Sequence, residues 1–418
     1  MGLHLALNFR RVDPSRGGAE TYVADLCRAL IAGGHRVDLY AEEWAEGVLP
    51  AEVRCLRVPS TGITPAARIR SFADNSALAL RGRAYDCTVG FINTWATDVL
   101  IPQGGVHEAS LEANARRFPE GWRRRLYLAA KRANPRARLY REIEAKQYAP
   151  QTGARLVVAV SRMVRGHLER FHGVPAERVR VIPNAIDAGR MAVPDPHETR
   201  RRYRRDNGLN DEDLVALFVG HNFRLKGLGP LLEALRLRLD RQPASRPVHL
   251  LVCGGGRLAP VARMVRRLGL QRFVRLVGFA PDLRAVFHAS DFFVLPTYYD
   301  PCSLVVFEAL ACGLPVITTA CNGAGEVITP GREGFVVPAP DELGALAEAI
   351  DHMADDAARR AMAKAAVVLG HEQSFGRHVA RLVEVFREVA DGHGSSVLGC
   401  RPPIIGRNTR NRHPLIDT

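Results

Sequence analysis

The chain has 418 residues, enough for two domains of ordinary size, and its 47% hydrophobic and 24% charged residues are typical of a globular protein. The net charge of +14, with a pI near 9.9, favours an anionic partner such as a nucleotide, an anionic membrane surface or nucleic acid. A general bias of the composition toward Arg would give the same total without any function.

Three other classes of protein are disfavoured. The cysteines are scattered without a Cys-x-x-Cys pair, which predicts reduced core residues rather than disulfides or a zinc site. No apolar run approaches the roughly 20 residues of a membrane span. The N-terminus predicts a first strand and is too short for a signal peptide, so we expect a cytoplasmic protein. The eight cysteines are Cys27, Cys55, Cys87, Cys253, Cys302, Cys312, Cys321 and Cys400.

The first half of the chain alternates between predicted strands and helices. Leu3 to Phe9 predicts a strand, and Gly17-Gly18 then opens a helix, where glycine lets backbone N–H groups approach a phosphate or a sugar. A strand that starts at Val99 runs into a loop ending at His107. A glycine pair is often only a turn and a lone His is usually structural, so neither feature identifies a function by itself.

Residues 109–149 form the most basic region, with eleven Arg and Lys against four Glu and with aromatic residues interleaved. The conventional interpretation is a solvated helix face. Our hypothesis is that this region binds an anionic membrane surface, with aromatic rings at headgroup level and Arg on phosphates. Nucleic acid is the least favoured partner, because no recognisable nucleic-acid-binding motif accompanies the region.

The second half begins with a hinge and a helix near residues 195–205, followed by a strand from Val215 to Gly220. Arg224 and Lys226 lie between that strand and the next helix, where two cations suit a pyrophosphate. Gly254 follows another strand in a glycine loop without the full dinucleotide fingerprint, so NAD binding is not supported. Phe279 follows the next strand, where an aromatic side chain can border a base.

The segment from Asp291 to Thr319 predicts a strand, a loop, a helix and a second strand. Asp300 precedes Pro301, which predicts an N-cap followed by Pro at the first helical position. Asp300 and Glu308 would then lie about 80° apart around one helix. Glu308 lies among apolar residues, where an ionised group is costly without partners. A sugar nucleotide suits this arrangement, with its diphosphate at the helix start and its hydroxyls on the carboxylates.

This segment resembles the signature of the retaining family-4 glycosyltransferases of the GT-B fold. Asp300, seven further residues and Glu308 are followed by Ala309-Leu-Ala-Cys-Gly-Leu-Pro-Val316. The usual first acid of the signature is Glu, so Asp300 is a shortened variant. Together with the Gly-Gly-x-Glu and Arg-x-Lys-Gly elements, the resemblance extends from about Gly17 to Phe375.

The resemblance implies a role for each candidate residue. Arg224 and Lys226 would hold the departing diphosphate, Glu308 the ribose hydroxyls and Asp300 the donor sugar, while His107 would lie near the anomeric centre. No metal ligand is evident, and no cofactor is expected beside the donor substrate. The expected catalytic residues are His107, Arg224, Lys226 and Asp300, and the expected donor-binding residues are Gly17, Gly18, Arg224, Lys226, Gly254, Phe279, Asp300, Ser303, Leu304, Val305 and Glu308.

The expected fold is α/β, of the GT-B type: two Rossmann-like parallel-sheet domains facing across a cleft, with a C-terminal crossover helix. Residues 1–192 would form the acceptor-side domain and residues 193–372 the nucleotide-sugar-binding domain. Residues 373–392 would form the crossover helix, and residues 393–418 a disordered basic tail.

The expected activity is transfer of a hexosyl group, with retention and without a metal, from a UDP-hexose to a hydroxyl group of a cell-envelope glycan or glycolipid. In this respect the chain is loosely similar to the lipopolysaccharide core glucosyltransferases. Two alternatives remain: a nucleotide-sugar epimerase or hydrolase on the same fold, and a non-catalytic membrane-bound scaffold. Acting on a glycolipid would place the protein on the inner face of the cytoplasmic membrane.

Overall fold

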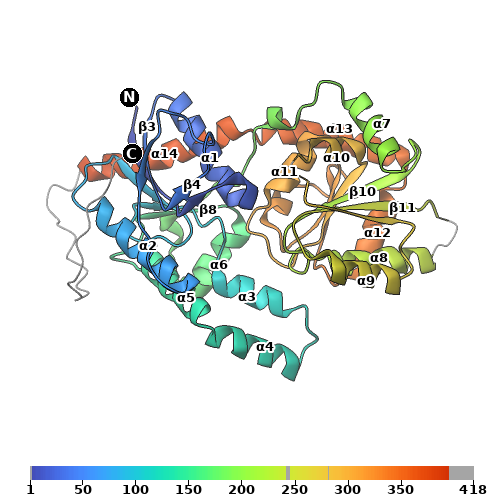
Figure 1. Cartoon of the computed structure of the whole chain (residues 1–418), viewed down its shortest axis with the longest axis horizontal. Coiled ribbons are helices and arrows are strands. Elements are labelled where there is room, and N and C mark those ends of the chain that lie inside the picture. Colours follow the sequence, from blue (N-terminus) through green and yellow to red (C-terminus); the bar gives the residue numbers. More distant parts are fainter. Residues whose placement is uncertain (1, 242–244, 281, 395–418) are drawn as a thin grey trace. The chain divides into compact units, whose positions relative to one another are not determined.

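The computed structural model describes residues 2–241, 245–280 and 282–394, which form two compact α/β units (Figure 1). Within the described ranges, the first unit comprises residues up to 112, residues 121–182 and residues from 379 onward, and the second comprises residues 113–120 and 183–378. The predicted basic tail lies, from residue 395 on, outside the described residues.

The chain enters the second unit after Ile182, whereas the sequence places this boundary after residue 192. Contacts of the intervening segment account for the difference. The side chain of Asn184 is buried and donates a hydrogen bond of 3.0 Å to the carbonyl of Cys302. The carbonyl of Ile186 accepts one of 3.1 Å from the backbone N–H of Phe375. This segment therefore packs with the second unit.

The first unit is built on a seven-stranded sheet in the order β5-β3-β1-β6-β7-β8-β9, and all of its strand pairs are parallel. Its central strands are apolar and buried because helices cover parallel sheets on both faces. A separate parallel pair consists of β2 and β4. The strands are β1 (His4–Asn8), β2 (Arg11–Val12), β3 (Arg36–Ala41), β4 (Glu43–Trp44), β5 (Arg54–Arg57), β6 (Cys87–Gly90), β7 (Val99–Leu100), β8 (Leu156–Ala159) and β9 (Val179–Val181).

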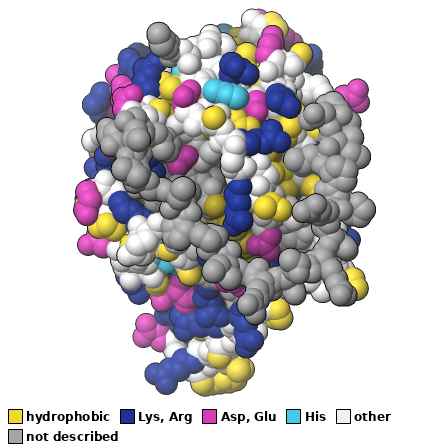
Figure 2. Space-filling model, turned by 90° about the vertical axis from the view of Figure 1, so that its left-hand side faces the viewer, with side chains coloured by type: hydrophobic (Ala, Val, Ile, Leu, Met, Phe, Trp, Pro, Cys, Tyr) yellow, Lys and Arg dark blue, Asp and Glu magenta, His cyan; other side chains and the backbone are white. Residues whose placement is uncertain are grey.

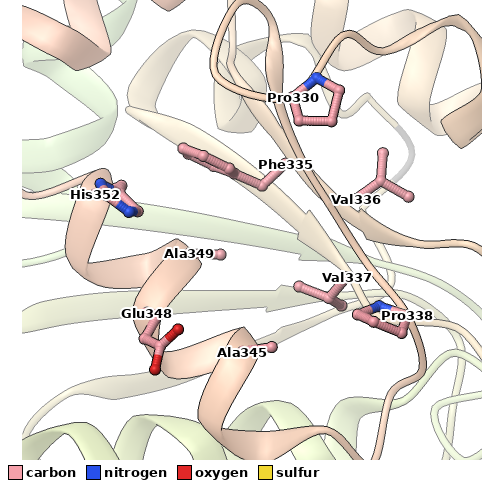
Figure 3. A pocket seen from close by; sticks show the side chains of 9 residues that line it. All are labelled: Pro330, Phe335, Val336, Val337, Pro338, Ala345, Glu348, Ala349 and His352. Atoms are coloured by element: carbon pink, nitrogen blue, oxygen red, sulfur yellow. The ribbon is translucent and has the colours of Figure 1, made fainter.

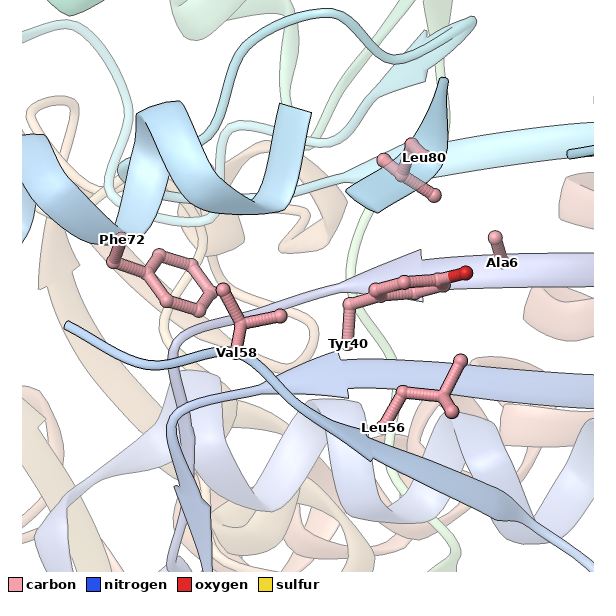
Figure 4. Close-up of a cluster of buried hydrophobic side chains, with 6 residues drawn as sticks. All are labelled: Ala6, Tyr40, Leu56, Val58, Phe72 and Leu80. Atoms are coloured by element: carbon pink, nitrogen blue, oxygen red, sulfur yellow. The ribbon is translucent and has the colours of Figure 1, made fainter. Parts of the chain in front are cut away.

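Helices of the first unit follow these strands in the chain. One core cluster lies between α2 and the strands β1, β3 and β5, where Phe72, Tyr40 and Leu56 pack together (Figure 4). The helices that begin in this unit are η1 (Pro14–Arg16), α1 (Gly18–Ala32), α2 (Pro65–Leu80), α3 (His107–Ala115), α4 (Trp122–Ala133), α5 (Pro135–Tyr148), α6 (Arg162–His172) and η2 (Ala176–Arg178).

The second unit contains a six-stranded parallel sheet in the order β12-β11-β10-β13-β14-β15. Every residue of its central strand, β10, is buried. The strands are β10 (Leu214–Val219), β11 (Val248–Cys253), β12 (Val274–Gly278), β13 (Phe292–Leu295), β14 (Val316–Thr319) and β15 (Gly334–Val337). The helices that begin in this unit are η3 (Ala188–Met191), α7 (Pro196–Asp206), α8 (Leu228–Arg241), α9 (Leu258–Arg267), α10 (Arg284–Ala289), α11 (Leu304–Ala311), η4 (Gly323–Val327), α12 (Leu343–His352), α13 (Asp356–Glu372) and α14 (Phe375–Gly394), and α14 belongs to the first unit from Val379 on.

Both sheets reverse their strand order at one point. In the second unit the chain adds β11 and β12 on one side of β10, and then β13, β14 and β15 on the other. In the first unit the same reversal occurs between β1 and β6. Ligands of open parallel sheets bind beyond the carboxyl ends of the strands at such a point. The topology therefore selects the loops after β10 and β13 as the first place to look for a site.

A buried arginine fixes α7 to the second sheet. Arg204 is fully buried, and its guanidinium donates hydrogen bonds to Asp291 (2.8 Å), to the carbonyl of Ala289 (2.9 Å) and to three carbonyls of the turn at residues 210–213 (2.8–3.0 Å). Asp291 also accepts from Arg200 (2.6 Å) and from the N–H of Val215 (2.7 Å). One buried ion pair thus joins α7, the start of β10 and the start of β13.

Replacing this arginine is expected to destabilise the second unit. Arg204→Met leaves Asp291 with Arg200 as its remaining cation and removes the donors to four carbonyls, so the free energy of unfolding should fall by about 3–5 kcal/mol. Urea unfolding followed by circular dichroism measures the change. Arg205→Met is the matched control, because Arg205 is exposed and 3.7 Å from Asp206, and it should change stability by about 0.5 kcal/mol or less. Equal unfolding midpoints of the two variants would contradict this account.

Candidate functional site

Hydrogen bonds hold the loop after β10 against the loop after β13, at the reversal of strand order. The carbonyl of Leu225 accepts hydrogen bonds from the hydroxyl of Thr297 (3.0 Å) and from the N–H of Tyr298 (2.8 Å). The side chain of Asn222 accepts from the N–H of Leu225 (3.2 Å), and its carbonyl accepts from the N–H of Lys226 (2.9 Å). These bonds fix the position at which the Lys226 side chain leaves the backbone.

Gly227 is required by the same close approach. Its φ of +76° is in the left-handed region, and a Cβ atom at this position would lie 1.8 Å from the carbonyl oxygen of Pro296. Any side chain here would separate the two loops. The Lys226-Gly227 pair of the sequence motif therefore combines a cation with the residue that lets it come near the next strand end.

Lys226 and Asp300 form an ion pair across the two loops, through Nζ and Oδ2. The side chains are 22% and 10% exposed, so the pair lies in the protein surface rather than in bulk solvent. The structure thus joins two of the four predicted catalytic residues.

The predicted start of the helix at Asp300 is wrong. The N–H of Asp300 donates to the carbonyl of Cys321 (3.0 Å), and its carbonyl accepts from the N–H of Gly323 (2.9 Å), so its backbone pairs with the loop after β14. Helix α11 begins at Leu304, with Ser303 as its N-cap. Asp300 and Glu308 therefore do not share a helix, and the expected angle between them around one axis does not apply.

Helix α11 carries the next group of predicted residues. Ser303 is buried, while Leu304, Val305 and Glu308 are half-buried in the first two turns. The first turn of a helix has N–H groups without intrahelical partners, which suit a phosphate. Val306, the residue between these positions, is buried and anchors the helix on the sheet side. The helix can thus present an amide end and a carboxylate to one ligand.

Three further predicted residues lie at the carboxyl edge of this sheet. Arg224 is exposed, and no carboxylate within the described residues pairs with it. Gly254 has a φ of +132°, and a Cβ there would lie 1.9 Å from the carbonyl oxygen of Gly220. Phe279 is 57% exposed rather than part of the core, so its ring is available to a ligand.

The first unit holds the remaining three predicted residues at the carboxyl edge of its own sheet. Gly17 is the N-cap of α1 and Gly18 its first residue, as the sequence predicts. His107 is the first residue of α3, and burial lowers the pKa of its imidazole, which favours the neutral form near neutral pH. Its Nε2 atom is buried and has no hydrogen-bond partner in the described part of the chain.

Two residues outside the predicted set of site residues hold the site loops. Asn322 is 1% exposed, and its side-chain oxygen accepts from the N–H groups of Ser303 (3.3 Å) and Ala324 (3.1 Å), which fixes the N-terminus of α11. Glu144 is buried in α5, and its carboxylate accepts from the N–H of His107 (2.7 Å). The available signal for Glu144 was a charged residue next to the apolar residues of a helix, such as Leu139 and Ile143.

Other places in the structure do not coincide with the predicted residues. A hollow of about 200 Å³ lies between β15 and α12 and is lined by Phe335, Glu348 and His352 among others, but by none of the predicted site residues (Figure 3).

Across the described ranges, no group of three His, Cys, Asp or Glu side chains is placed to bind a metal ion. None of the described helices is long and apolar enough to cross a membrane. The seven described cysteines are free, and Cys400 lies outside the described residues.

Two family models match the two halves of the chain separately, with the change between residues 190 and 199. Residues 16–190 match the model of Glycosyltransferase Family 4, and residues 199–367 match that of Glycosyl transferases group 1. A probable transglycosylase of Burkholderia thailandensis is 31% identical over 380 residues, which cover 90% of this chain and 94% of the relative. The lipopolysaccharide glucosyltransferase WaaG of Escherichia coli is 25% identical over 330 residues, covering 78% and 82%.

Solved structures show the same fold. The crystal structure of WaaG, a glycosyltransferase involved in lipopolysaccharide biosynthesis, has a TM-score of 0.75 at 22% identity and covers 91% of this chain and 99% of its own. HepE of Anabaena, in complex with UDP and glucose, has a TM-score of 0.63 at 18% identity and covers 92% and 98%. Because one family model matches most of the first unit, a second matches most of the second, and a relative is 31% identical along nearly the whole chain, the protein belongs to the family 4, group 1 glycosyltransferases of the GT-B fold.

Proposed function

We propose that this glycosyltransferase moves a hexosyl group from a UDP-hexose to a hydroxyl group of a cell-envelope glycan or glycolipid, with retention and without a metal. The observation that carries the proposal is the Lys226–Asp300 pair at the reversal of strand order, with exposed Arg224 beside it in the sequence. Lys226 and Arg224 would bind the diphosphate, and the first turn of α11 would add N–H groups. Glu308 would bind the ribose, and Phe279 would border the base.

The proposed reaction places charge where these cations lie. The bond between the anomeric carbon and the phosphate oxygen breaks, and a bond from the acceptor oxygen to the same face of the anomeric carbon forms. The acceptor proton passes to the departing phosphate oxygen. Lys226 and Arg224 would stabilise the negative charge that develops on the leaving diphosphate, which is an electrostatic contribution. The uncharged imidazole of His107 would lie near the anomeric carbon.

Relatives support this choice of donor and acceptor and add one competitor. Solved structures of HepE contain UDP, glucose or UDP-glucose, and WaaG is a lipopolysaccharide glucosyltransferase. The probable transglycosylase of Burkholderia thailandensis favours a second candidate, transfer from a glycan instead of a nucleotide sugar. Release of a nucleoside diphosphate during transfer distinguishes the two, because only the first reaction produces it.

Removing the lysine amine should reduce transfer severely without unfolding the protein. Lys226→Met removes a cation from the leaving diphosphate, so kcat for acceptor-dependent UDP release should fall about 10²–10³-fold. The assay supplies UDP-glucose and an extract of cell-envelope glycolipid, and it is repeated without the extract. Lys364→Met is the control, because Lys364 is an exposed lysine of α13 in the same unit. Near-normal release by folded Lys226→Met would remove the diphosphate assignment.

Nucleotide binding should depend on the glutamate of α11. Calorimetric titration of the wild-type protein with UDP, GDP and ADP is expected to show preferential binding of UDP. Glu308→Gln replaces a charged hydrogen-bond acceptor by a neutral amide, so affinity for UDP should fall roughly ten-fold or more. Glu348→Gln, in α12 beside the separate hollow, serves as the matched control. Undetectable binding of all three nucleotides to the wild-type protein would overturn the proposed donor class.

We further propose that α4 binds an anionic membrane surface from the cytoplasmic side. None of its residues is buried, and Trp122 and Leu126 are 69% and 61% exposed. It contains three Arg in succession and no acidic residue. Figure 2 shows Lys and Arg side chains around hydrophobic side chains at the lower end of one face, the end at which Figure 1 places α4. Apolar side chains bordered by cations suit lipid chains and anionic headgroups.

We restrict this proposal to one helix of the basic region. In α5, Leu139, Ile143 and Tyr148 are buried against the rest of the first unit and do not belong to an exposed face. In α4, Arg123, Arg125 and Lys131 are exposed and pair with no carboxylate within the described residues. The surface proposed for lipid is therefore Trp122–Ala133 and not the whole of residues 109–149.

Sedimentation with vesicles tests this surface. The protein should bind vesicles of mixed phosphatidylglycerol and phosphatidylcholine and not those of phosphatidylcholine alone. Replacing Arg123 and Arg125 by Gln should weaken binding roughly 30-fold, at about 1 kcal/mol for each cation. Ile63→Ser is the control, since Ile63 is 98% exposed but lies outside α4. Equal and negligible binding of the wild-type protein to both kinds of vesicle would refute the proposal.

A further inference from the structure

The carboxylate of Glu144 joins three helices of the first unit. Glu144 is 8% exposed although it lies in the most basic region of the sequence. Its Oε1 accepts a hydrogen bond of 2.7 Å from the N–H of His107, the first residue of α3. Its Oε2 lies 3.2 Å from Nε2 of His172, near the end of α6. Both oxygens are therefore engaged.

The same helix contacts the imidazole itself. Tyr140 lies one turn before Glu144 on α5, and its ring centroid is 5.2 Å from that of His107. The phenol oxygen accepts a hydrogen bond of 2.9 Å from Arg136, which holds this ring in place. Helix α5 thus holds the backbone of His107 with one residue and its side chain with another.

A second buried polar residue of α5 holds the neighbouring loop. Gln147 is 6% exposed and donates hydrogen bonds to the carbonyls of Thr94 (2.5 Å) and Phe91 (3.5 Å), in the loop after β6. That loop contains two non-glycine residues with left-handed backbones, Asn93 and Ala96, each with φ of 63°. Such conformations persist where surrounding contacts enforce them. Helix α5 therefore fixes the loops after both β6 and β7.

The burial of Glu144 is not explained by a solvated helix face, which would leave the carboxylate in water. Burying a carboxylate costs several kcal/mol unless it is paired and hydrogen-bonded. Burying it at the N-terminus of α3 offsets part of this cost, because an anion is stabilised there. An apolar residue of similar size would pack in the same space without that cost, but it could not hold the N–H of His107. The position of Glu144 is thus better explained by the residue it holds than by stability alone.

We propose that Glu144 is a positioning residue for His107, which it holds at the carboxyl edge of the first sheet, where Nε2 can take a hydrogen bond from or to a ligand. This inference rests on the proposed function, in which His107 lies near the anomeric centre. Nε2 of His107 is buried and has no partner within the described chain, as expected of an atom whose partner is the substrate. Loss of Glu144 would let the start of α3 move and would misplace the imidazole.

The test compares three single variants of Glu144 and His107, and one double variant, in the full-length protein. Glu144→Leu removes both oxygens, and a displacement of about 1 Å at a reacting centre can cost about 10²-fold in rate, so kcat should fall by that order. The KM for the nucleotide sugar should stay within about two-fold, because Arg224, Lys226 and Glu308, which would bind the diphosphate and the ribose, belong to the other unit. Glu144→Gln keeps an oxygen for the N–H of His107 and should restore most of the rate. In a His107→Ala background, Glu144→Leu should cause no further loss.

Two controls separate this role from a general loss of structure. Glu142→Leu changes an acid of the same helix that pairs with Arg70 and Lys146 at the surface, and it should leave kcat within about two-fold. If Glu144→Leu does not fold, Tyr140→Leu and Glu144→Gln still test the inference. Tyr140→Leu should lower kcat, and both variants should shift the NMR signal of the His107 imidazole. That signal is identified by its absence from the spectrum of His107→Ala.

The outcomes distinguish the inference from the proposed function. If His107→Ala transfers normally, the role of His107 is wrong and the inference fails with it, whereas nucleotide binding and the effect of Lys226→Met would still stand. If His107→Ala is impaired, two results would show that the positioning role of Glu144 is wrong while the proposed function survives. In the first, Glu144→Leu lowers kcat further in the His107→Ala background. In the second, Glu144→Leu leaves kcat unchanged in the wild-type background.

Discussion

The site in the second unit depends on the parallel sheet and its single reversal of strand order. Successive parallel strands are joined by right-handed crossovers, so helices that follow steps in opposite directions cover opposite faces of the sheet. The steps from β10 to β11 and from β13 to β14 go in opposite directions. The helices that follow these two loops, α8 and α11, therefore leave the strand ends toward opposite faces of the sheet, and ligands of such sheets bind beyond these strand ends. The two loops themselves are in contact, and the Lys226–Asp300 pair joins them.

Buried polar side chains provide hydrogen-bond partners for the backbone of the loops in both units. Loops rarely bury their backbone without partners for its N–H and C=O groups. In this protein single side chains supply several partners at once: Arg204 to the turn before β10, Asn322 to the start of α11, and Glu144 and Gln147 to the loops after β7 and β6. Each group is costly to bury, and each is located where a loop must hold one shape. Asn322, Glu144 and Gln147 hold loops at the carboxyl edges of the two sheets, where the candidate site residues lie, whereas Arg204 holds the amino edge of the second sheet.

Sequence patterns predicted the strands and helices well because apolar runs and glycine breaks act locally. They also placed Arg224, Lys226 and Gly227 correctly between β10 and α8. The start of α11 was misassigned, because an Asp-Pro pair is a strong local signal for a helix start, while the bonds from Asp300 to Cys321 and Gly323 come from a distant loop. Glu144 was overlooked for the same reason, since nothing near it in the sequence reveals that His107 and His172 flank its carboxylate. The sequence therefore did not predict the contacts of Asp300 and Glu144, because these contacts are made by residues far away in the chain.

The length of the side chain at Asp300 matters for which donors the site can accept. A ligand that takes Lys226 from Asp300 must replace the attraction between two opposite charges at a site that is partly shielded from solvent. A neutral glycan offers only hydroxyl groups in exchange, whereas a diphosphate carries more charge than the carboxylate it displaces. The short Asp side chain, tied at its backbone to Cys321 and Gly323, has little freedom to follow the lysine toward a ligand. The Lys226–Asp300 pair therefore supports the proposed donor, a nucleoside diphosphate sugar, over an uncharged glycan.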